Sequence, residues 1–189
     1  MGQFAIGQPV PRTEDPRLLT GRGKYVDDIT LAAQAHAFVL RSPHAHARIV
    51  SIDTREARSM PGVLGIFTGE DWAKEGFGHL APTMPRHRRD GSSLFVQPRP
   101  ALAHGKAVVV GDPVAFVVAE TVAQAKDAAE HIRVSYEALE ALIDTAAIGA
   151  RRGPALWEGC PDNETFFFTL GDKGAVDAAF TRAHHVTRL

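Results

Sequence analysis

The sequence of 189 residues contains a single cysteine, Cys160. One thiol excludes a disulfide within the chain, and it also excludes an all-cysteine zinc site or an iron–sulfur cluster held by this chain alone, because those need several thiolates. Such sparse cysteine is typical of a reducing compartment, and we expect a cytoplasmic protein. The N-terminal residues lack the charged start and apolar core of a signal peptide, and no run of about 18 apolar residues predicts membrane insertion.

The sequence also lacks an excess of either charge, with 21 basic and 22 acidic residues and a formal net charge of −1. A nucleic-acid-binding protein usually carries a basic excess or a basic face, so nucleic acid is not an expected partner. Apolar residues make up 44% of the chain, enough for a core in one domain with or without a shorter appendage.

Short apolar runs predict the strands of an α+β fold. The run at 114–119 is continuous, which predicts a strand covered on both faces. Alternation of apolar and polar residues over 132–137 predicts a strand with one buried face. The remaining strands are expected at 23–29, 35–40, 47–52, 63–67, 108–110 and 165–170, with one more beginning at 184.

Four segments carry the start signals of helices. Asp53 followed by Glu56, and Thr68 followed by Asp71, have the spacing of a capping box. Thr121 with Gln124 repeats it, and the helix that follows carries one apolar stripe of Ala125, Ala128, Ala129 and Ile132. Asp172 is the expected N-cap of a last helix, whose stripe is Val176, Ala179, Phe180 and Ala183.

Two segments show no periodicity. Residues 1–20 are rich in proline, glycine and charge and predict an extended arm. Residues 76–106 contain many glycines and prolines and the basic run RHRR at 86–89. A loop of this length in a compact domain is typically functional, disordered or held by a partner. A solvated loop remains the simpler interpretation of the basic run, with contact to an acidic partner or a phosphate as the alternative.

The stretch RSPHAHARIV at 41–50 raises the question of a metal site. On a strand, His44 and His46 would project from the same face. Zinc needs at least three protein ligands, however, and only His36 lies near them in the sequence, so a structural role is favoured. The adjacent pair His184 and His185 would face opposite sides of a strand and not chelate together.

The remaining candidates are weaker still. Gly111 stands alone before a strand, which favours a hairpin turn over a dinucleotide-binding loop, and the glycines at 21–23 fail for the same reason. Cys160 has no base beside it in the sequence, so nothing marks it as a catalytic thiol. The residues alone therefore assign no catalytic, cofactor-binding or metal-binding position.

Four stretches carry a resemblance to a known family. They are RTEDPRLLTGRGKYVDDI (12–29), RSPHAHARIVSIDTREARSMPGVLGIFTGED (41–71), VGDPVAFVVAETVAQAKDAAEHIRVSYEAL (110–139) and GDKGAVDAAFTRAHHV (171–186). Together they resemble the N-terminal part of the molybdenum-binding large subunit of the xanthine dehydrogenase, carbon monoxide dehydrogenase and aldehyde oxidase family. The resemblance covers nearly the whole chain in order, and the arm and the residues SPHAHARI are most similar to the carbon-monoxide-dehydrogenase-like branch.

The resemblance implies an α/β hammerhead domain with a mixed sheet and flanking helices over 21–145, preceded by the arm 1–20. Residues 146–189 would be a linker and the start of a molybdopterin-binding domain. The resemblance implies a parent enzyme that uses molybdopterin, with iron–sulfur clusters and FAD in partner subunits or domains. The family's pterin-binding loops and catalytic glutamate lie beyond position 189, so none of its site residues is carried over.

The favoured hypothesis is a scaffold and subunit-docking portion of a molybdenum-dependent hydroxylase or dehydrogenase, not catalytically competent alone. Its partners would be the rest of the large subunit and the iron–sulfur and FAD subunits. One alternative is a free-standing hammerhead module for binding or assembly, without enzyme activity. The other, a metal-dependent hydrolase built on His44 and His46, has the least support.

Overall fold

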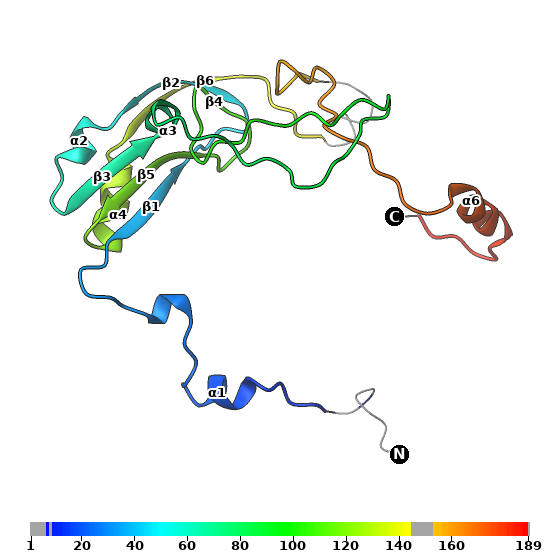
Figure 1. Cartoon of the computed structure of the whole chain (residues 1–189), viewed down its shortest axis with the longest axis horizontal. Coiled ribbons are helices and arrows are strands. Elements are labelled where there is room, and N and C mark those ends of the chain that lie inside the picture. The colour runs from blue at the N-terminus through cyan, green and yellow to red at the C-terminus, as the bar shows by residue number, and fades with distance from the viewer. Residues whose placement is uncertain (1–6, 8, 145–152, 189) are drawn as a thin grey trace.

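The computed structural model describes residues 7, 9–144 and 153–188, and its body consists of two three-stranded sheets (Figure 1). In the first sheet the strand order is β1-β5-β3, and in the second it is β4-β2-β6. All pairings between the named strands are antiparallel. The α+β class is confirmed, whereas the expected mixed sheet is replaced by two antiparallel ones in the described part of the chain.

The bounds of the elements agree with most of the expected segments. The strands are β1 (His36–Arg41), β2 (Ala47–Asp53), β3 (Val63–Thr68), β4 (Lys106–Ala107), β5 (Pro113–Ala119) and β6 (Arg133–Ala138). The helices are α1 (Asp15–Leu19), η1 (Val26–Asp28, a 3₁₀ turn), α2 (Arg55–Arg58), α3 (Gly69–Lys74), α4 (Val122–Glu130) and α6 (Lys173–Arg182).

Helix α4 packs on one face of the first sheet and makes the core. Thr121 caps it as expected, since its hydroxyl accepts a hydrogen bond from the Gln124 backbone N–H at 3.2 Å. The predicted stripe is confirmed, because Ala125, Ala128, Ala129 and Ile132 are all buried. They meet the side chains of β5 that point to the same side, which are Ala115, Val117 and Ala119. Small side chains on both elements allow the helix backbone to approach the strand closely.

The opposite face of the first sheet is open, which corrects the expectation that β5 is covered on both sides. Phe116 on β5 is 37% exposed, and Phe67 on the neighbouring β3 is 50% exposed. Val114, on the same face of β5, is buried, so the exposed region is limited to part of the strand. The continuous apolar run therefore does not mean that this chain covers both faces by itself.

Several local expectations are wrong. Residues 23–29 contain the turn η1 and no strand, and the segments 165–170 and 184–188 form no named strand. The strand expected at 108–110 lies at β4, two residues earlier. Gly111 does lie in a turn, with φ of 89°, but β4 and β5 belong to different sheets, so that turn closes no hairpin.

The caps of the two short helices differ from each other. Asp71 accepts hydrogen bonds from both the backbone N–H and the hydroxyl of Thr68, as the capping-box spacing predicts. Asp53 is not the N-cap of α2, which is Thr54, and its carboxylate instead binds the Arg55 backbone and guanidinium. The guanidinium competes for the oxygens that a capping carboxylate would offer.

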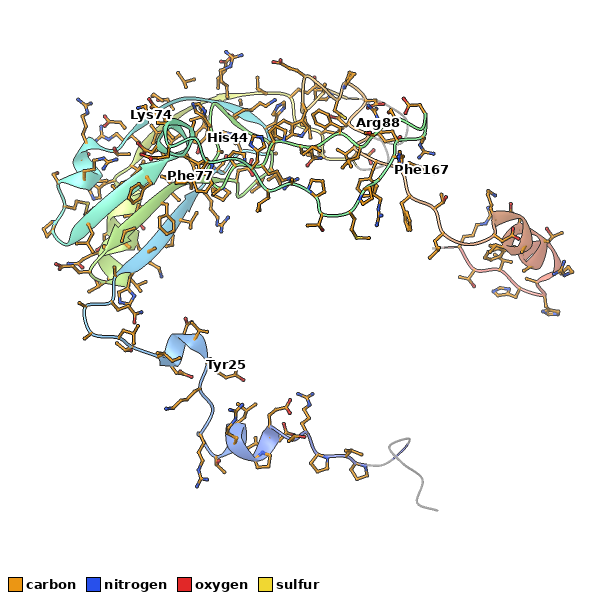
Figure 2. The ribbon with its side chains drawn as sticks, viewed as in Figure 1. Tyr25, His44, Lys74, Phe77, Arg88 and Phe167 are labelled. Carbon is orange, nitrogen blue, oxygen red and sulfur yellow. The ribbon has the colours of Figure 1, made fainter. Side chains whose placement is uncertain are left out.

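Both ends of the chain leave the body (Figure 1). The arm before β1 carries α1 and η1, and Tyr25 on it is exposed and far from the sheets in Figure 2. The total accessible surface is 14587 Å². A compact protein of this mass exposes about 8,800 Å², so the chain exposes roughly 1.7 times the usual surface. No helix among the described residues is long and apolar enough to cross a bilayer.

Gly69, the first residue of α3, tests the contact between this helix and the loop before β4. A Cβ at this position would lie 2.2 Å from the Ala103 carbonyl oxygen. Gly69→Ala should therefore destabilise the chain by roughly 1–3 kcal/mol, the usual effect of overpacking, as measured by urea unfolding. Gly78→Ala is the matched control, because its Cβ would meet no atom within 4 Å. Equal urea midpoints for Gly69→Ala and Gly78→Ala would contradict the close approach of Gly69 to the Ala103 carbonyl.

Candidate functional site

An apolar groove lies on the open face of the first sheet. It has a volume of about 690 Å³. Trp72 and Phe77 stack at one wall with their ring centroids 4.8 Å apart, and the Trp72 indole N–H donates to the Gly78 carbonyl. The main apolar lining residues are Val39, Phe67, Trp72, Phe77, Leu102 and Phe116. Its polar side chains, Arg41, Asp71 and Glu75 among them, are few.

His44 and His46 do not form a joint site. They lie before β2 in a bent segment, so the strand geometry that would align them is absent. The His44 ring packs on Tyr136 with centroids 4.8 Å apart. His46 is buried, and its Nδ1 lies 2.7 Å from the Glu140 carbonyl oxygen. Since a carbonyl can only accept, Nδ1 carries the proton, and Nε2 has no partner in the described part of the chain.

The other histidine candidates are also separate. His36 begins β1, and His184 and His185 follow α6 on the exposed C-terminal segment. His185 Nε2 lies 3.0 Å from the Thr187 hydroxyl. Among residues 7, 9–144 and 153–188, no three His, Cys, Asp or Glu side chains are grouped so that they could hold a metal ion. The geometry therefore gives no support to a hydrolase built on His44 and His46.

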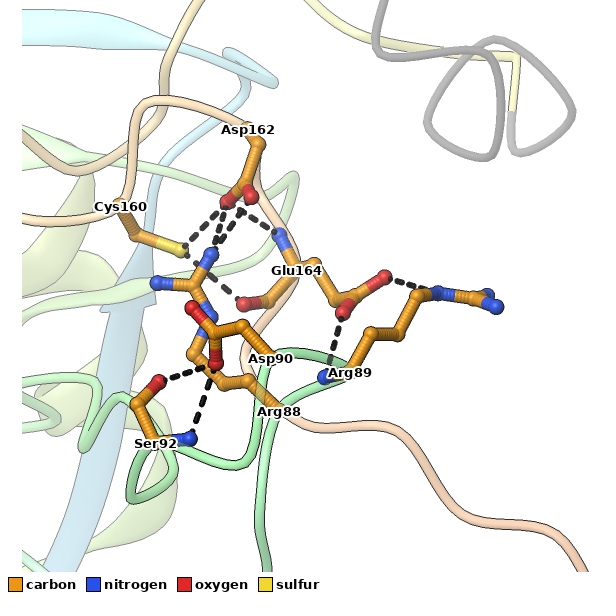
Figure 3. A network of polar contacts seen from close by, with 7 residues as sticks. All are labelled: Arg88, Arg89, Asp90, Ser92, Cys160, Asp162 and Glu164. Atoms are coloured by element: carbon orange, nitrogen blue, oxygen red, sulfur yellow. Dashed lines mark hydrogen bonds and ion pairs between the residues drawn. The ribbon is translucent and has the colours of Figure 1, made fainter.

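The basic run 86–89 has partners within the chain. Arg88 donates to both carboxylate oxygens of Asp162, at 2.7 Å to Oδ1, and both side chains are about four-fifths buried (Figure 3). Arg89 donates to Glu164 at 2.7 Å, and its guanidinium lies 3.7 Å from the centre of the Phe167 ring. The run is thus not a free basic patch: Arg88 is largely shielded, whereas the Arg89 side chain is paired but still 57% exposed to solvent.

Cys160 lies inside this network (Figure 3). Its sulfur is 3.6 Å from Asp162 Oδ1 and 3.5 Å from the Glu164 carbonyl oxygen, and the residue is fully buried. Burial, and then the neighbouring Asp162 carboxylate, raises the pKa of the thiol. A thiolate is therefore disfavoured here, which is the opposite of what a nucleophilic cysteine requires.

A second charged cluster joins α2 to β6. Glu56 accepts from Arg133 at 3.0 Å, and its other oxygen lies 2.8 Å from His131 Nδ1. The hydrogen bond with His131 and the charge of Arg133 lower the pKa of Glu56. The side chains of Glu56 and His131 are about half exposed and that of Arg133 is largely exposed. The cluster links two surface elements and lines a hollow of about 280 Å³.

The apolar groove does not fit a molybdenum cofactor. A pterin with its phosphate needs several convergent polar donors, whereas the groove is lined mainly by apolar side chains. The described residues also offer no grouped metal ligands. The one cysteine of the sequence is engaged with Asp162 and Glu164. No step of a molybdenum reaction can therefore be derived from these residues.

Comparison with known proteins decides the family. The sequence model described as "Aldehyde oxidase and xanthine dehydrogenase, a/b hammerhead domain" matches residues 20–140. This chain belongs to the aldehyde oxidase and xanthine dehydrogenase family. Its α+β body is the hammerhead domain of that family.

The relatives of this family member are large subunits. The chain is 40% identical over 96% of its length to the nicotine 6-hydroxylase large subunit of Paenarthrobacter nicotinovorans, covering 21% of that protein. It is 35% identical over 94% of its length to the carbon monoxide dehydrogenase large chain of Afipia carboxidovorans, covering 22% of it. The chain thus spans about a fifth of each of these two relatives.

Solved structures agree. The Cu,Mo-containing carbon monoxide dehydrogenase matches 95% of the chain with a TM-score of 0.69 and 33% identity, and the chain covers 23% of it. Quinoline 2-oxidoreductase from Pseudomonas putida 86 matches 79% with a TM-score of 0.64 and 42% identity, and the chain covers 18% of it.

Sequence reasoning missed the two acidic residues that pair with the basic run 86–89. Asp162 and Glu164 lie more than 70 positions from their arginine partners, and nothing in local periodicity reports such a distant pair. A weak signal exists in residues 162–168, where two acidic residues are followed by three phenylalanines, which complements a basic run in charge and in cation–π chemistry.

Acid should weaken the ion pairs of Arg88 with Asp162 and of Arg89 with Glu164. A hydrogen bond from the Glu164 backbone, together with Arg88, lowers the pKa of Asp162, and the Arg89 hydrogen bond lowers that of Glu164. Carboxyl groups with a lowered pKa stabilise the fold above their unfolded pKa of about 4 and lose that effect as pH falls through the folded pKa. Asp162→Asn should therefore lose less thermal stability than the wild type between pH 6 and pH 3.

The control for this pH comparison is Asp15→Asn, which lies on the arm. Its loss of thermal stability over the same range should match that of the wild type. If the melting temperatures of Asp162→Asn and the wild type fell equally between pH 6 and pH 3, the role assigned to the Asp162 carboxylate would be contradicted.

Proposed function

We propose that this chain is the N-terminal scaffold and docking portion of the large subunit of a molybdenum-dependent hydroxylase or dehydrogenase, of carbon monoxide, xanthine or aldehyde type. In this proposal residues 1–20 are an arm, residues 21–145 the hammerhead domain, and residues 146–189 a linker and the start of the molybdopterin-binding domain. The supporting observation is the match of almost the entire chain to about a fifth of each large subunit.

The molybdenum chemistry would reside in the rest of the large subunit. Two of the relatives are molybdenum proteins by name, a xanthine dehydrogenase molybdenum-binding subunit and a Cu,Mo-containing carbon monoxide dehydrogenase. Redox hydroxylation needs a cofactor, since side chains cannot carry the electrons. Iron–sulfur and FAD subunits complete the proposed assembly, and a cytoplasmic location fits the single cysteine.

The apolar groove supports a docking role for the hammerhead domain. Its aromatic lining stays partly exposed, and the chain as a whole exposes far more surface than a compact protein of its mass. The proposed occupant is the remainder of the large subunit, because about four-fifths of each relative lies outside the matched part. A groove of this kind would otherwise be an aggregation-prone surface.

The purified chain should contain neither stoichiometric metal nor flavin. The measurement is metal content by mass spectrometry together with flavin absorbance, after expression in cells that make molybdopterin. The double variant His44→Ala/His46→Ala should leave the metal content unchanged, because the two rings have separate partners. Stoichiometric molybdenum or flavin in the chain alone would contradict the scaffold proposal. Metal that disappears in the double variant would revive the hydrolase.

The coding sequence after codon 189 separates the scaffold from a free-standing module. The scaffold proposal expects it to continue into the remainder of a large subunit. A stop codon there, with no neighbouring gene for a molybdenum-binding domain, would favour the module.

A further inference from the structure

Two segments that are far apart in the sequence are paired through their backbones. The Phe167 N–H donates to the His87 carbonyl at 2.9 Å, and the Phe95 N–H donates to the Thr165 carbonyl at 2.9 Å. These bonds join the loop at 86–95 to the segment at 160–168. In Figure 2, Arg88 and Phe167 lie beside each other at the end of the body from which the C-terminal segment departs.

The side chains that flank these backbone bonds are complementary in charge. The Arg88–Asp162 pair is largely shielded from water, so it is screened less than a surface pair, and one guanidinium nitrogen of Arg88, Nη2, contacts both carboxylate oxygens. Arg89 and Glu164 make a second pair beside it, with the Arg89 backbone N–H also 3.4 Å from the same carboxylate. Both arginines lie on the loop at 86–95 and both carboxylates on the segment at 160–168, so the two ion pairs together fix which residues of the two segments face each other.

Aromatic rings complete the contact. The guanidinium of Arg89 lies over Phe167 and that of Arg86 lies 4.9 Å from the centre of the Phe168 ring. Cation–π contacts of this kind add stabilisation that does not depend on the carboxylates. The segment therefore offers the basic run both the anions and the ring faces that arginine binds best.

A second anchor lies just before this segment. The Lys106 ammonium donates to the Leu156 carbonyl and lies 5.3 Å from the centre of a Trp157 ring. Gly159 passes so close to Phe95 that an added Cβ would lie 2.8 Å from its ring. The body thus contacts the C-terminal segment from Leu156 to Phe168 along most of its length.

We propose that the basic run 86–89 and the segment 153–168 form a clasp, an interface that holds the C-terminal part of the chain on the hammerhead body without help from the connecting residues 145–152. The partner that this surface fits is an acidic, aromatic peptide, and its occupant is residues 153–168 of the same chain. The clasp fixes where the chain leaves the body toward α6. This inference does not depend on the proposed function.

Cutting the connection tests the clasp directly. A recognition site for a sequence-specific protease is inserted between Ala147 and Ile148 of the full chain, which is folded, cleaved and passed through a size-exclusion column at about 50 µM. A covalent link supplies an effective concentration near millimolar, and cleavage removes it, so only the contacts themselves can then retain the piece. The clasp predicts that residues 148–189 co-elute with the body. Separation of the two pieces would overturn it.

Variants assign the retention to the basic run. Arg88→Ala should raise the dissociation constant of the cleaved piece by about tenfold or more, as expected when a hydrogen bond between charged groups is lost. Arg99→Ala is the matched control in the same loop, since its side chain bonds only to Gln97 among the contacts described, and it should bind as the wild type does. The swap of Arg88→Asp with Asp162→Arg should recover part of the loss. Equal retention in Arg88→Ala and in the wild type would overturn the role of the run.

Cys160 reports on the clasp in the intact, uncleaved chain. Its alkylation should be slow while the clasp is closed and should accelerate in Arg88→Ala, because opening exposes the buried thiol. Loss of the positive charge alone would act the other way, since Arg88 lowers the pKa of this thiol. A slower reaction in Arg88→Ala, with an unchanged circular dichroism spectrum, would therefore overturn the opening that the clasp predicts.

Discussion

The body of this protein depends on the packing of α4 against β5 through alanines. Ala125, Ala128 and Ala129 on the helix meet Ala115 and the small residues beside it on the central strand, and all are buried. Because these side chains are so small, the two backbones come close, but little apolar surface is buried per residue. The core is therefore thin. Phe38 packs against it from β1, whereas Phe67 and Phe116 lie on the opposite face of the sheet.

That division fits the scaffold role proposed for the hammerhead domain. The alanine-lined contact supplies a folded platform, and the groove around Phe67, Trp72 and Phe116 leaves that platform with a partly exposed apolar face, which is the surface proposed to receive the rest of a large subunit. The clasp between the basic run 86–89 and residues 153–168 depends on polar contacts and not on alanine packing. The shielded Arg88–Asp162 ion pair and the contact of Arg89 with the Phe167 ring hold the C-terminal segment.

The local elements of the fold could be predicted from the sequence, because their signals are local. The stripe of α4 follows from spacing, and the caps at Thr121 and Asp172 follow from residue type. The strand expected at 165–170 failed, because its phenylalanines are held by arginines of a distant loop and only one bridge pairs the backbone. The resemblance identified the family, whereas the partners of Arg88 and Arg89 required the tertiary structure.

The central claim is that a stable hammerhead body carries surfaces that other parts of a large subunit cover. Hydrogen–deuterium exchange of the chain alone and within the complete large subunit tests it most directly. The account predicts that amides of β5 are protected in both states, while those of residues 9–35 exchange rapidly in the chain alone and become protected in the larger protein. An arm already protected in the chain alone, or one still unprotected in the larger protein, would contradict the account.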